Sequence, residues 1–373
     1  MISRLVLAVF LAAPLSARGQ TIQVPAFRLP PSNQLSDAAR KVLDRMADAT
    51  AQIAITGDVA KQREFYGQWN DDRLAEMRRH FRTVVRREKL GGVAVDTVEP
   101  ADGVAPGNTM RVLVNVHGGA FMWGAGSGAL VEAIPIAATM RVRVVTVDYR
   151  LAPEHRYPAA TEDVTAVYRA LLKRYRAENI GIYGCSAGGI ITAQATAWIG
   201  KQGLPRPGAI GTFCGTGAAY SGDSPYLAPA TAGNAPPAIS TLPPTLPVSY
   251  MAGVPADDPI AYPLSSDAQI RAMPPTLLLA GSRDFAVSAL TLAHRHLAAA
   301  GVPSELYIFD GLPHAFFMWP DMPDPTRRSR LSPASSTHIS AVARVDRRGY
   351  ALTLGIPRKS RLPIFTPCTR RIA

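Results

Sequence analysis

Short apolar runs alternate with helical segments along the middle of the chain. A run rich in Val, Ile or Leu predicts a buried strand, and six such runs occur, at residues 111–117, 142–149, 179–185, 209–214, 275–281 and 304–309. Helical spacing follows at residues 164–172, 186–201 and 287–300. This succession of strand, helix and strand predicts a mostly parallel central sheet flanked by helices and joined by right-handed crossovers.

Two helices are expected before the first strand. Ser36 could cap a helix that continues to about residue 54, and a second helical stretch spans residues 59–87. These helices either form a lid over a site further along the chain or pack on the edge of the sheet. Residues 93–99 alternate weakly and predict an edge strand.

An irregular segment at residues 217–260 is rich in Pro, Ala, Thr and Gly and has little periodicity. An insertion of this length inside a compact domain is usually a lid or a mobile loop. We therefore expect one folded domain at residues 20–325, with a lid formed by residues 35–87 and 217–260.

The two ends of the chain differ from this body. Arg4, an apolar stretch and the small residues Ala17 and Gly19 predict an export signal at residues 1–19, and hence a periplasmic or secreted protein. Residues 326–373 are rich in Pro and Arg and predict a basic, disordered tail. Of the formal net charge of +12, most lies in this tail, which has eleven Lys and Arg against one acid. The body is nearly neutral, so no nucleic-acid partner is expected.

Composition limits the chemistry further. The three cysteines, Cys185, Cys214 and Cys368, are too few for a disulfide framework and suggest no metal site. No apolar run is long enough to span a membrane, so no stable membrane insertion is expected. The composition leaves a homodimer open.

The turn around Ser186 is the strongest chemical signal. The strand predicted at residues 179–185 ends in Gly-x-Ser-x-Gly, at Gly184 to Gly188, and leads into a helix. A side chain at either glycine would collide with the neighbouring strand or the following helix, so the pattern follows from a sharp, strained turn. Such a turn exposes the serine oxygen beside the free N–H groups of a helix N-terminus. Ser186 is therefore a candidate nucleophile.

A serine nucleophile needs a base and an acid that orients the base. Asp284 and His314 each follow a predicted strand, so both lie at the sheet edge where Ser186 emerges. Other residues fit less well because they fall in the irregular segment, in mid-helix, close to His314 or before the turn at Ser186: Asp257, Asp258, His294, His296, Asp310 and His117. We expect Ser186, Asp284 and His314 to act together.

A glycine loop follows the strand at residues 111–117. Gly118 and Gly119 either turn N–H groups toward a substrate oxygen or simply form a turn. Phe121, Met122 and Trp123 come next and either line a substrate pocket or pack in the core or lid.

Three motifs together resemble one family, the hormone-sensitive-lipase group of α/β-hydrolases, known in bacteria as the type IV esterases. They are His117-Gly118-Gly119-Ala120-Phe121, Asp148-Tyr149-Arg150-Leu151-Ala152-Pro153-Glu154 and Gly184-Cys185-Ser186-Ala187-Gly188-Gly189. The chain order Ser, Asp, His also agrees with this fold. The resemblance covers about residues 90–320 and implies an α/β-hydrolase fold with a helical lid.

The resemblance also implies a function. It is that of a serine carboxylesterase that hydrolyses short-chain carboxylic esters and needs no cofactor or metal. The implied triad is Ser186, Asp284 and His314, and the implied oxyanion hole consists of the N–H groups of Gly118, Gly119 and Ala187. Phe121 and Trp123 are the expected substrate-binding residues.

The chain departs from the family pattern before the nucleophile, where Cys185 stands in place of the usual Asp, and at Ala120, which replaces a common third glycine. Arg150 and Glu154 are expected to hold their loop through a local ion pair and hydrogen bonds rather than to contact substrate. Two alternatives to the esterase stay open: a lactone or amide hydrolase with the same triad, and a catalytically inactive ligand-binding protein.

Overall fold

The computed structural model describes residues 24, 28–48, 57–235, 237–239, 241–320 and 322. The chain divides into two units, Met1–Pro30 and Pro31–Ala373, and the fold described below is that of the second. The expected export signal, the basic tail from residue 326 and residues 49–54 of the first expected helix lie outside the described residues.

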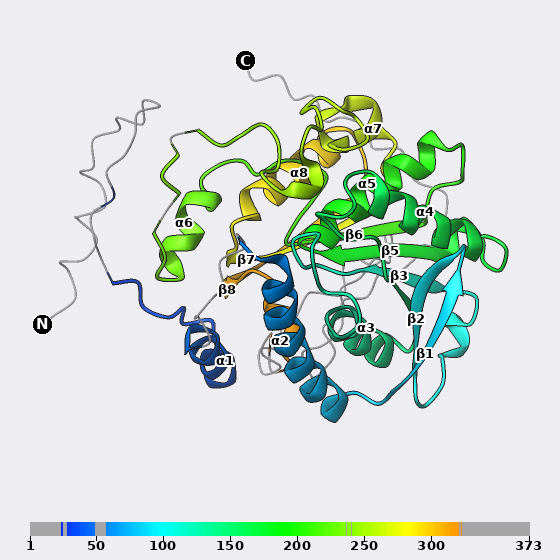
Figure 1. Ribbon diagram of the computed structural model, residues 1–373, viewed down its shortest axis with the longest axis horizontal. Helices are drawn as coiled ribbons and strands as arrows, with labels where there is room; N and C mark the ends of the chain where they lie inside the picture. Colours follow the sequence, from blue (N-terminus) through cyan, green and yellow to red (C-terminus); the bar gives the residue numbers. More distant parts are fainter. Residues whose placement is uncertain are drawn as a thin grey trace, which may run out of the picture. The chain divides into compact units, whose positions relative to one another are not determined.

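An eight-stranded sheet forms the centre of the second unit (Figure 1). Its spatial order is β1-β2-β4-β3-β5-β6-β7-β8; β2 pairs antiparallel with both of its neighbours, and all other pairs are parallel. The predicted mostly parallel sheet is confirmed. The strands are β1 (Thr83–Leu90), β2 (Val93–Pro100), β3 (Val112–Val116), β4 (Arg143–Val147), β5 (Ile180–Cys185), β6 (Ala209–Phe213), β7 (Thr276–Arg283) and β8 (Ser304–Pro313).

Helices cover both faces of the sheet. The α-helices are α1 (Asp37–Asp48), α2 (Val59–His80), α3 (Ser127–Met140), α4 (Ala159–Leu171), α5 (Ala187–Lys201), α6 (Ser224–Thr231), α7 (Asp267–Arg271) and α8 (Val287–Ala299). Short 3-10 helices occur at Pro106–Asn108, Ala177–Asn179, Ser249–Met251, Pro263–Ser265 and Phe316–Met318. As expected, Ser36 caps α1, because its Oγ accepts a hydrogen bond from Ala39 N at 3.1 Å.

The side chains of β3 alternate between two apolar clusters, one on each face of the sheet. Val112, Val114 and Val116 belong to a cluster that includes residues of α4, α5 and α8, whereas Leu113 belongs to a cluster that includes residues of α1, α2 and α3. Because successive residues of a strand point to opposite faces, a strand covered on both sides is apolar at nearly every position, and Asn115 is the one polar residue of β3. All five residues of β3 are buried accordingly.

The prediction of one long helix over residues 59–87 is wrong, since α2 ends at His80 and β1 begins at Thr83. The charged residues of β1 face β2 across the strand pair, where Arg86 bonds Glu99 and Arg87 bonds Asp96. The strand at residues 93–99 is therefore not an edge strand, because β1 lies outside it.

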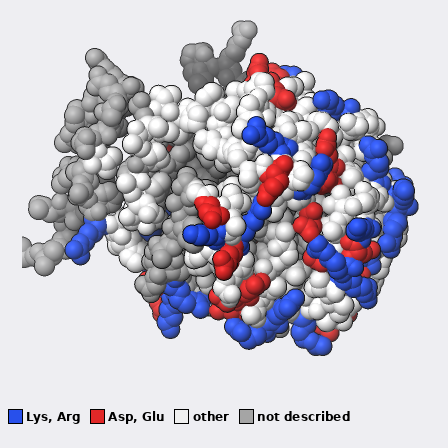
Figure 2. All heavy atoms as spheres, viewed as in Figure 1, with Lys and Arg blue, Asp and Glu red and all other residues white. Residues whose placement is uncertain are grey.

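The segment at residues 217–260 contains only one α-helix, α6, and the short 3-10 helix at Ser249–Met251 among its described residues. Figure 2 shows few charged side chains over α6, whereas acidic and basic side chains are interspersed over β1, β2 and α4. Within the described part of the chain, no helix combines the length and the apolar character needed to cross a membrane.

Candidate active site

The turn between β5 and α5 holds Ser186 in a strained conformation. Its φ of 57° and ψ of −122° are unusual for a residue with a side chain. A Cβ on Gly188 would lie 1.8 Å from Val116 O, and one on Gly184 would lie 2.3 Å from the same atom. The two glycines therefore let the turn pack against β3, as the sequence pattern predicts.

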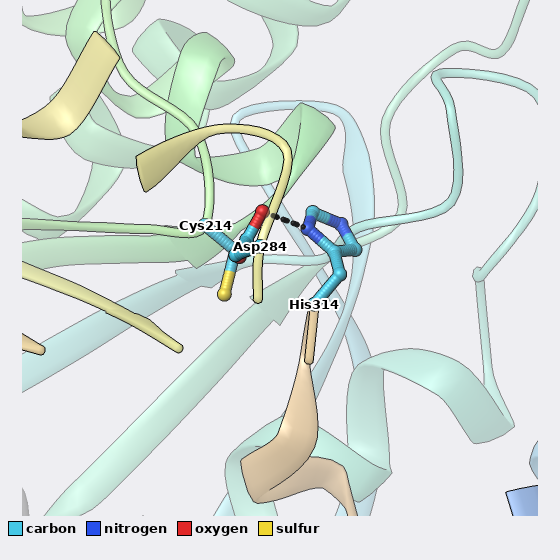
Figure 3. Close-up of side chains that lie close together, drawn as sticks. All are labelled: Cys214, Asp284 and His314. Carbon is cyan, nitrogen blue, oxygen red and sulfur yellow. Dashed lines mark hydrogen bonds and ion pairs between the residues drawn. The ribbon is translucent and has the colours of Figure 1, made fainter. Parts of the chain in front are cut away.

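Asp284 and His314 meet at the ends of β7 and β8. His314 Nδ1 lies 2.9 Å from Asp284 Oδ1, and the carboxylate is fully buried. Figure 3 shows the imidazole turned toward that carboxylate. Asp284 Oδ1 also accepts the N–H of Ala286 at 2.8 Å, which fixes the orientation of the carboxylate. An acid in this position holds one imidazole nitrogen protonated and leaves the other free to accept a proton.

The His314 ring is held from one side by an aromatic neighbour. Phe285 stacks on it with ring centroids 4.3 Å apart and an interplanar angle of 23°. The next residue, Ala315, donates its N–H to Cys214 Sγ at 3.4 Å. Contacts at the ring and at the backbone therefore restrict the position of the imidazole.

Cys214, Asp284 and His314 could each offer a metal ligand, and their donor atoms lie within 4.8 Å of one another (Figure 3). However, Nδ1 of the histidine and Oδ1 of the aspartate are already bonded to each other. Burial also raises the pKa of Cys214 well above its ordinary value, which disfavours the thiolate that a metal would require. The geometry fits an acid and base pair better than a metal centre.

The prediction that Gly118 N–H belongs to the oxyanion hole is wrong. This N–H donates to Glu132 Oε1 at 2.8 Å, so it is not available to a substrate. Glu132 lies on α3 and is only 4% exposed, and its Oε2 accepts a second bond from Asn115 Nδ2 at 2.9 Å. Burial raises the pKa of Glu132 to about 7, although these bonds and the charge of Arg73 favour its ionised form.

Other N–H groups beside Ser186 are free. The N–H groups of Gly119, Ala120 and Ala187 donate no hydrogen bond to any other residue that the structure describes. Positive φ values at Gly119 and Ala120, of 111° and 50°, turn this loop sharply. A Cβ on Gly119 would lie 2.1 Å from Trp123 O, so only glycine fits there. The available donors are therefore one residue further along the loop than the family resemblance implies.

A cavity of about 290 Å³ brings these groups together. Ser186, His314, Gly119 and Ala187 all line it. The expected pocket residues Phe121 and Trp123 line it too, but both are also packed against other rings. Phe121 stacks on Tyr250 with ring centroids 4.6 Å apart, and Trp123 stacks on Tyr66 at 4.2 Å.

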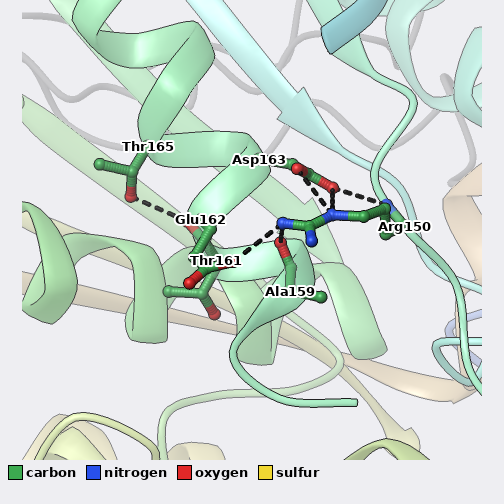
Figure 4. Close-up of polar contacts among 6 residues, drawn as sticks. All are labelled: Arg150, Ala159, Thr161, Glu162, Asp163 and Thr165. Atoms are coloured by element: carbon green, nitrogen blue, oxygen red, sulfur yellow. Dashed lines mark hydrogen bonds and ion pairs between the residues drawn. The ribbon is translucent and has the colours of Figure 1, made fainter. Parts of the chain in front are cut away.

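Arg150 and Glu154 each hold their loop through a different partner. Arg150 bonds Glu162 and Asp163 at the start of α4 and the carbonyl oxygen of Ala159 (Figure 4). Glu154 instead forms a bidentate ion pair with Arg63 of α2, with both bonds at 2.7 Å. The sequence contains both loop residues but does not reveal that α2 supplies a partner.

Three of the other candidate histidines and aspartates have clear structural partners. His117 is fully buried, stacks on Tyr149 at 4.2 Å, and has its pKa lowered to about 4 by burial. His294 bonds Ser304, and Asp258 caps a turn through the N–H groups of Ile260 and Ala261. Cys185 is fully buried in the core between the sheet and α3, as expected for a small apolar residue.

Comparison with known proteins identifies the family. A family model for the alpha/beta hydrolase fold matches residues 113–318, which is more than half of the chain. The chain therefore belongs to the α/β-hydrolase fold family. It is 32% identical to Esterase LipU from Mycobacterium tuberculosis over 60% of this chain and 74% of that protein. For three other curated relatives, the chain spans only 33%, 39% and 42% of their length.

Solved structures agree with this assignment. Esterase E25 superimposes with a TM-score of 0.68 at 27% identity, covering 81% of this chain and 93% of that one. EstE7, described as a hormone-sensitive-lipase homologue from a metagenome library, gives a TM-score of 0.60 at 27% identity, covering 75% and 91%. The resemblance to the hormone-sensitive-lipase group is confirmed.

Proposed function

We propose that this protein is a serine carboxylesterase that hydrolyses short-chain carboxylic esters through an acyl-enzyme intermediate. The observation that carries the proposal is the buried Asp284–His314 hydrogen bond at a cavity that Ser186 also lines. The free N–H groups beside Ser186 and the esterase names of the relatives support it.

In the proposed reaction, Ser186 Oγ attacks the ester carbonyl carbon while His314 Nε2 takes the hydroxyl proton. Asp284 stabilises the resulting imidazolium through the Nδ1 hydrogen bond. The negative charge on the carbonyl oxygen is stabilised by the N–H groups of Gly119, Ala120 and Ala187.

The tetrahedral intermediate then collapses to the acyl-enzyme, and the leaving alcohol takes its proton from His314. A water molecule gives a proton to His314 as it attacks the acyl carbon, and the second collapse returns that proton to Ser186 and releases the acid. No metal or organic cofactor is needed for these steps.

The test is hydrolysis of p-nitrophenyl acetate and butyrate by the wild type, Ser186→Ala and Asp284→Asn. We expect Ser186→Ala to lose at least about a thousandfold in kcat, and Asp284→Asn about ten-thousandfold, because the amide favours the wrong imidazole tautomer. Wild-type rates in Ser186→Ala would refute the proposal. The chain-length preference follows from a series of p-nitrophenyl esters with the same protein.

We further propose that residues 1–19 direct export. Fractionation of cells that express the full chain would test this, since protein found only in the cytoplasm with residue 1 retained would contradict it.

A further inference from the structure

A guanidinium lies at the cavity that Ser186 and His314 line. Arg73 is on α2, and the cavity wall includes Arg73 together with Asn70 and Trp69 of the same helix. None of these three residues has a part in the proposed hydrolysis.

The hydrogen-bonding groups of Arg73 are only partly used. Its Nη2 donates to Asn70 Oδ1, and its Cζ lies over the rings of Trp69 and Trp319, 5.2 and 5.7 Å from their centroids. Its Nε is buried and finds no hydrogen-bond acceptor among the described residues. Nor does any carboxylate in the described part of the chain form an ion pair with Arg73, although Glu132 acts on it electrostatically.

Glu132 does not accept a hydrogen bond from Arg73. Its two carboxylate oxygens already accept hydrogen bonds from Gly118 N and Asn115 Nδ2. The guanidinium nonetheless stays charged at neutral pH, because burial lowers the pKa of Arg73 only to about 10. A buried cation with an unsatisfied N–H is costly unless an oxygen acceptor pairs with it.

We propose that this part of the cavity is a subsite for a carboxylate on the substrate, so that the preferred esters carry a carboxylate group on the acyl or the alcohol part. The guanidinium pairs with carboxylates in a fixed fork geometry and keeps its charge while doing so. Trp69, Trp123 and Met318 also line the cavity and provide apolar contacts for the chain between the ester and the carboxylate. This inference rests on the proposed esterase function.

The experiment compares pairs of esters that differ in the terminal group. For the acyl side, the monomethyl esters of succinic, glutaric and adipic acid are paired with methyl butyrate, pentanoate and hexanoate. For the alcohol side, 4-acetoxybutanoate is paired with butyl acetate. Hydrolysis is followed by titration of the released acid, and the readout is the ratio of kcat/KM within each pair.

We expect the wild type to favour the carboxylate ester in one of the two series, and the responding series identifies which part of the substrate faces Arg73. Arg73→Met should lower that ratio by about 10- to 100-fold, the loss typical of a hydrogen bond to a charged group. Arg73→Lys should retain part of the ratio, because a point charge remains. Arg78→Met, at an exposed position of the same helix, should leave the ratio unchanged.

The outcome separates this subsite from the proposed function. Hydrolysis of the plain esters without a preference in either series, or a preference that survives in Arg73→Met, overturns the subsite and leaves the esterase proposal intact. If Arg73→Met fails to fold, competitive inhibition of the wild type decides instead. N-methylhexanamide inhibiting as well as the mono-N-methylamide of adipic acid, and N-butylacetamide as well as 4-acetamidobutanoate, would overturn the subsite, whereas stronger inhibition by the carboxylate member of either pair would support it.

Discussion

The buried carboxylate of Glu132 gives a sharp prediction for stability. Its pKa is raised from an ordinary 4.5 to about 7, mainly by burial. Between these two values the folded protein holds a proton that the unfolded chain has released. Stability therefore falls as the pH rises through this window and levels off above about pH 7. Integrated over the whole window, the shift corresponds to about 3 kcal/mol.

The perturbation is Glu132→Gln, which removes the ionisation and keeps the shape. Its amide oxygen can still accept the N–H of Gly118. Its amide nitrogen can donate to Asn115 Oδ1, which has no hydrogen-bond partner among the described residues, if the Asn115 amide turns over. Relative to wild type, the variant should therefore gain about 2 to 3 kcal/mol between about pH 5 and about pH 8.

Urea unfolding of both proteins across this pH range, with the midpoint and slope determined at each pH, measures the difference. Glu64→Gln on the exposed face of α2 serves as the control and should show no comparable change. The other ionisable groups that interact with Glu132 are Arg73, Tyr149, Tyr183 and Cys185, and both proteins contain all of them. A difference between wild type and variant that stays constant with pH would refute this account of the oxyanion loop.

Two further substitutions test the turn and the base. Gly188→Ala should destabilise the fold by about 3 kcal/mol or more, because its Cβ would lie 1.8 Å from Val116 O. Gly67→Ala has open space around it in α2 and should stabilise the fold by about 0.5 to 1 kcal/mol. Thermal melts compare the two variants, and equal effects on stability would contradict the steric argument. Phe285→Leu removes the ring that stacks on His314 and should lower kcat on p-nitrophenyl butyrate by about two- to tenfold with KM little changed. A higher KM with an unchanged kcat would show instead that Phe285 contacts the substrate.

The sequence predicts most of the central sheet, because strands buried on both faces appear as continuous apolar runs. It fails at β1, whose charged residues resemble the exposed face of a helix. Only the pairing with β2 explains them, through bonds such as Arg87 to Asp96. The glycine pair Gly91 and Gly92, both at positive φ between the two strands, is the local signal of a hairpin that could have revealed it.

The candidate site, too, could be predicted only in part from the sequence. Ser186 can be found from its Gly-x-Ser-x-Gly turn, and Asp284 and His314 from their positions directly after predicted strands. The choice of oxyanion donors cannot be predicted this way, because Gly118 and Gly119 look equivalent in sequence. Their difference depends on Glu132, which lies on α3, a helix buried over eight of its residues and therefore without an amphipathic pattern.

Stoichiometric labelling with diethyl p-nitrophenyl phosphate tests the central claim most directly. The reagent phosphorylates an activated serine and releases p-nitrophenolate, which reports the number of reactive groups per chain, and mass spectrometry of the digested protein locates the adduct. We expect one equivalent released per chain, an adduct on the peptide that contains Ser186, loss of esterase activity in parallel, and no labelling of Ser186→Ala. Complete loss of activity with the adduct on another residue, or unchanged labelling of Ser186→Ala, would contradict the assignment of Ser186 as the nucleophile.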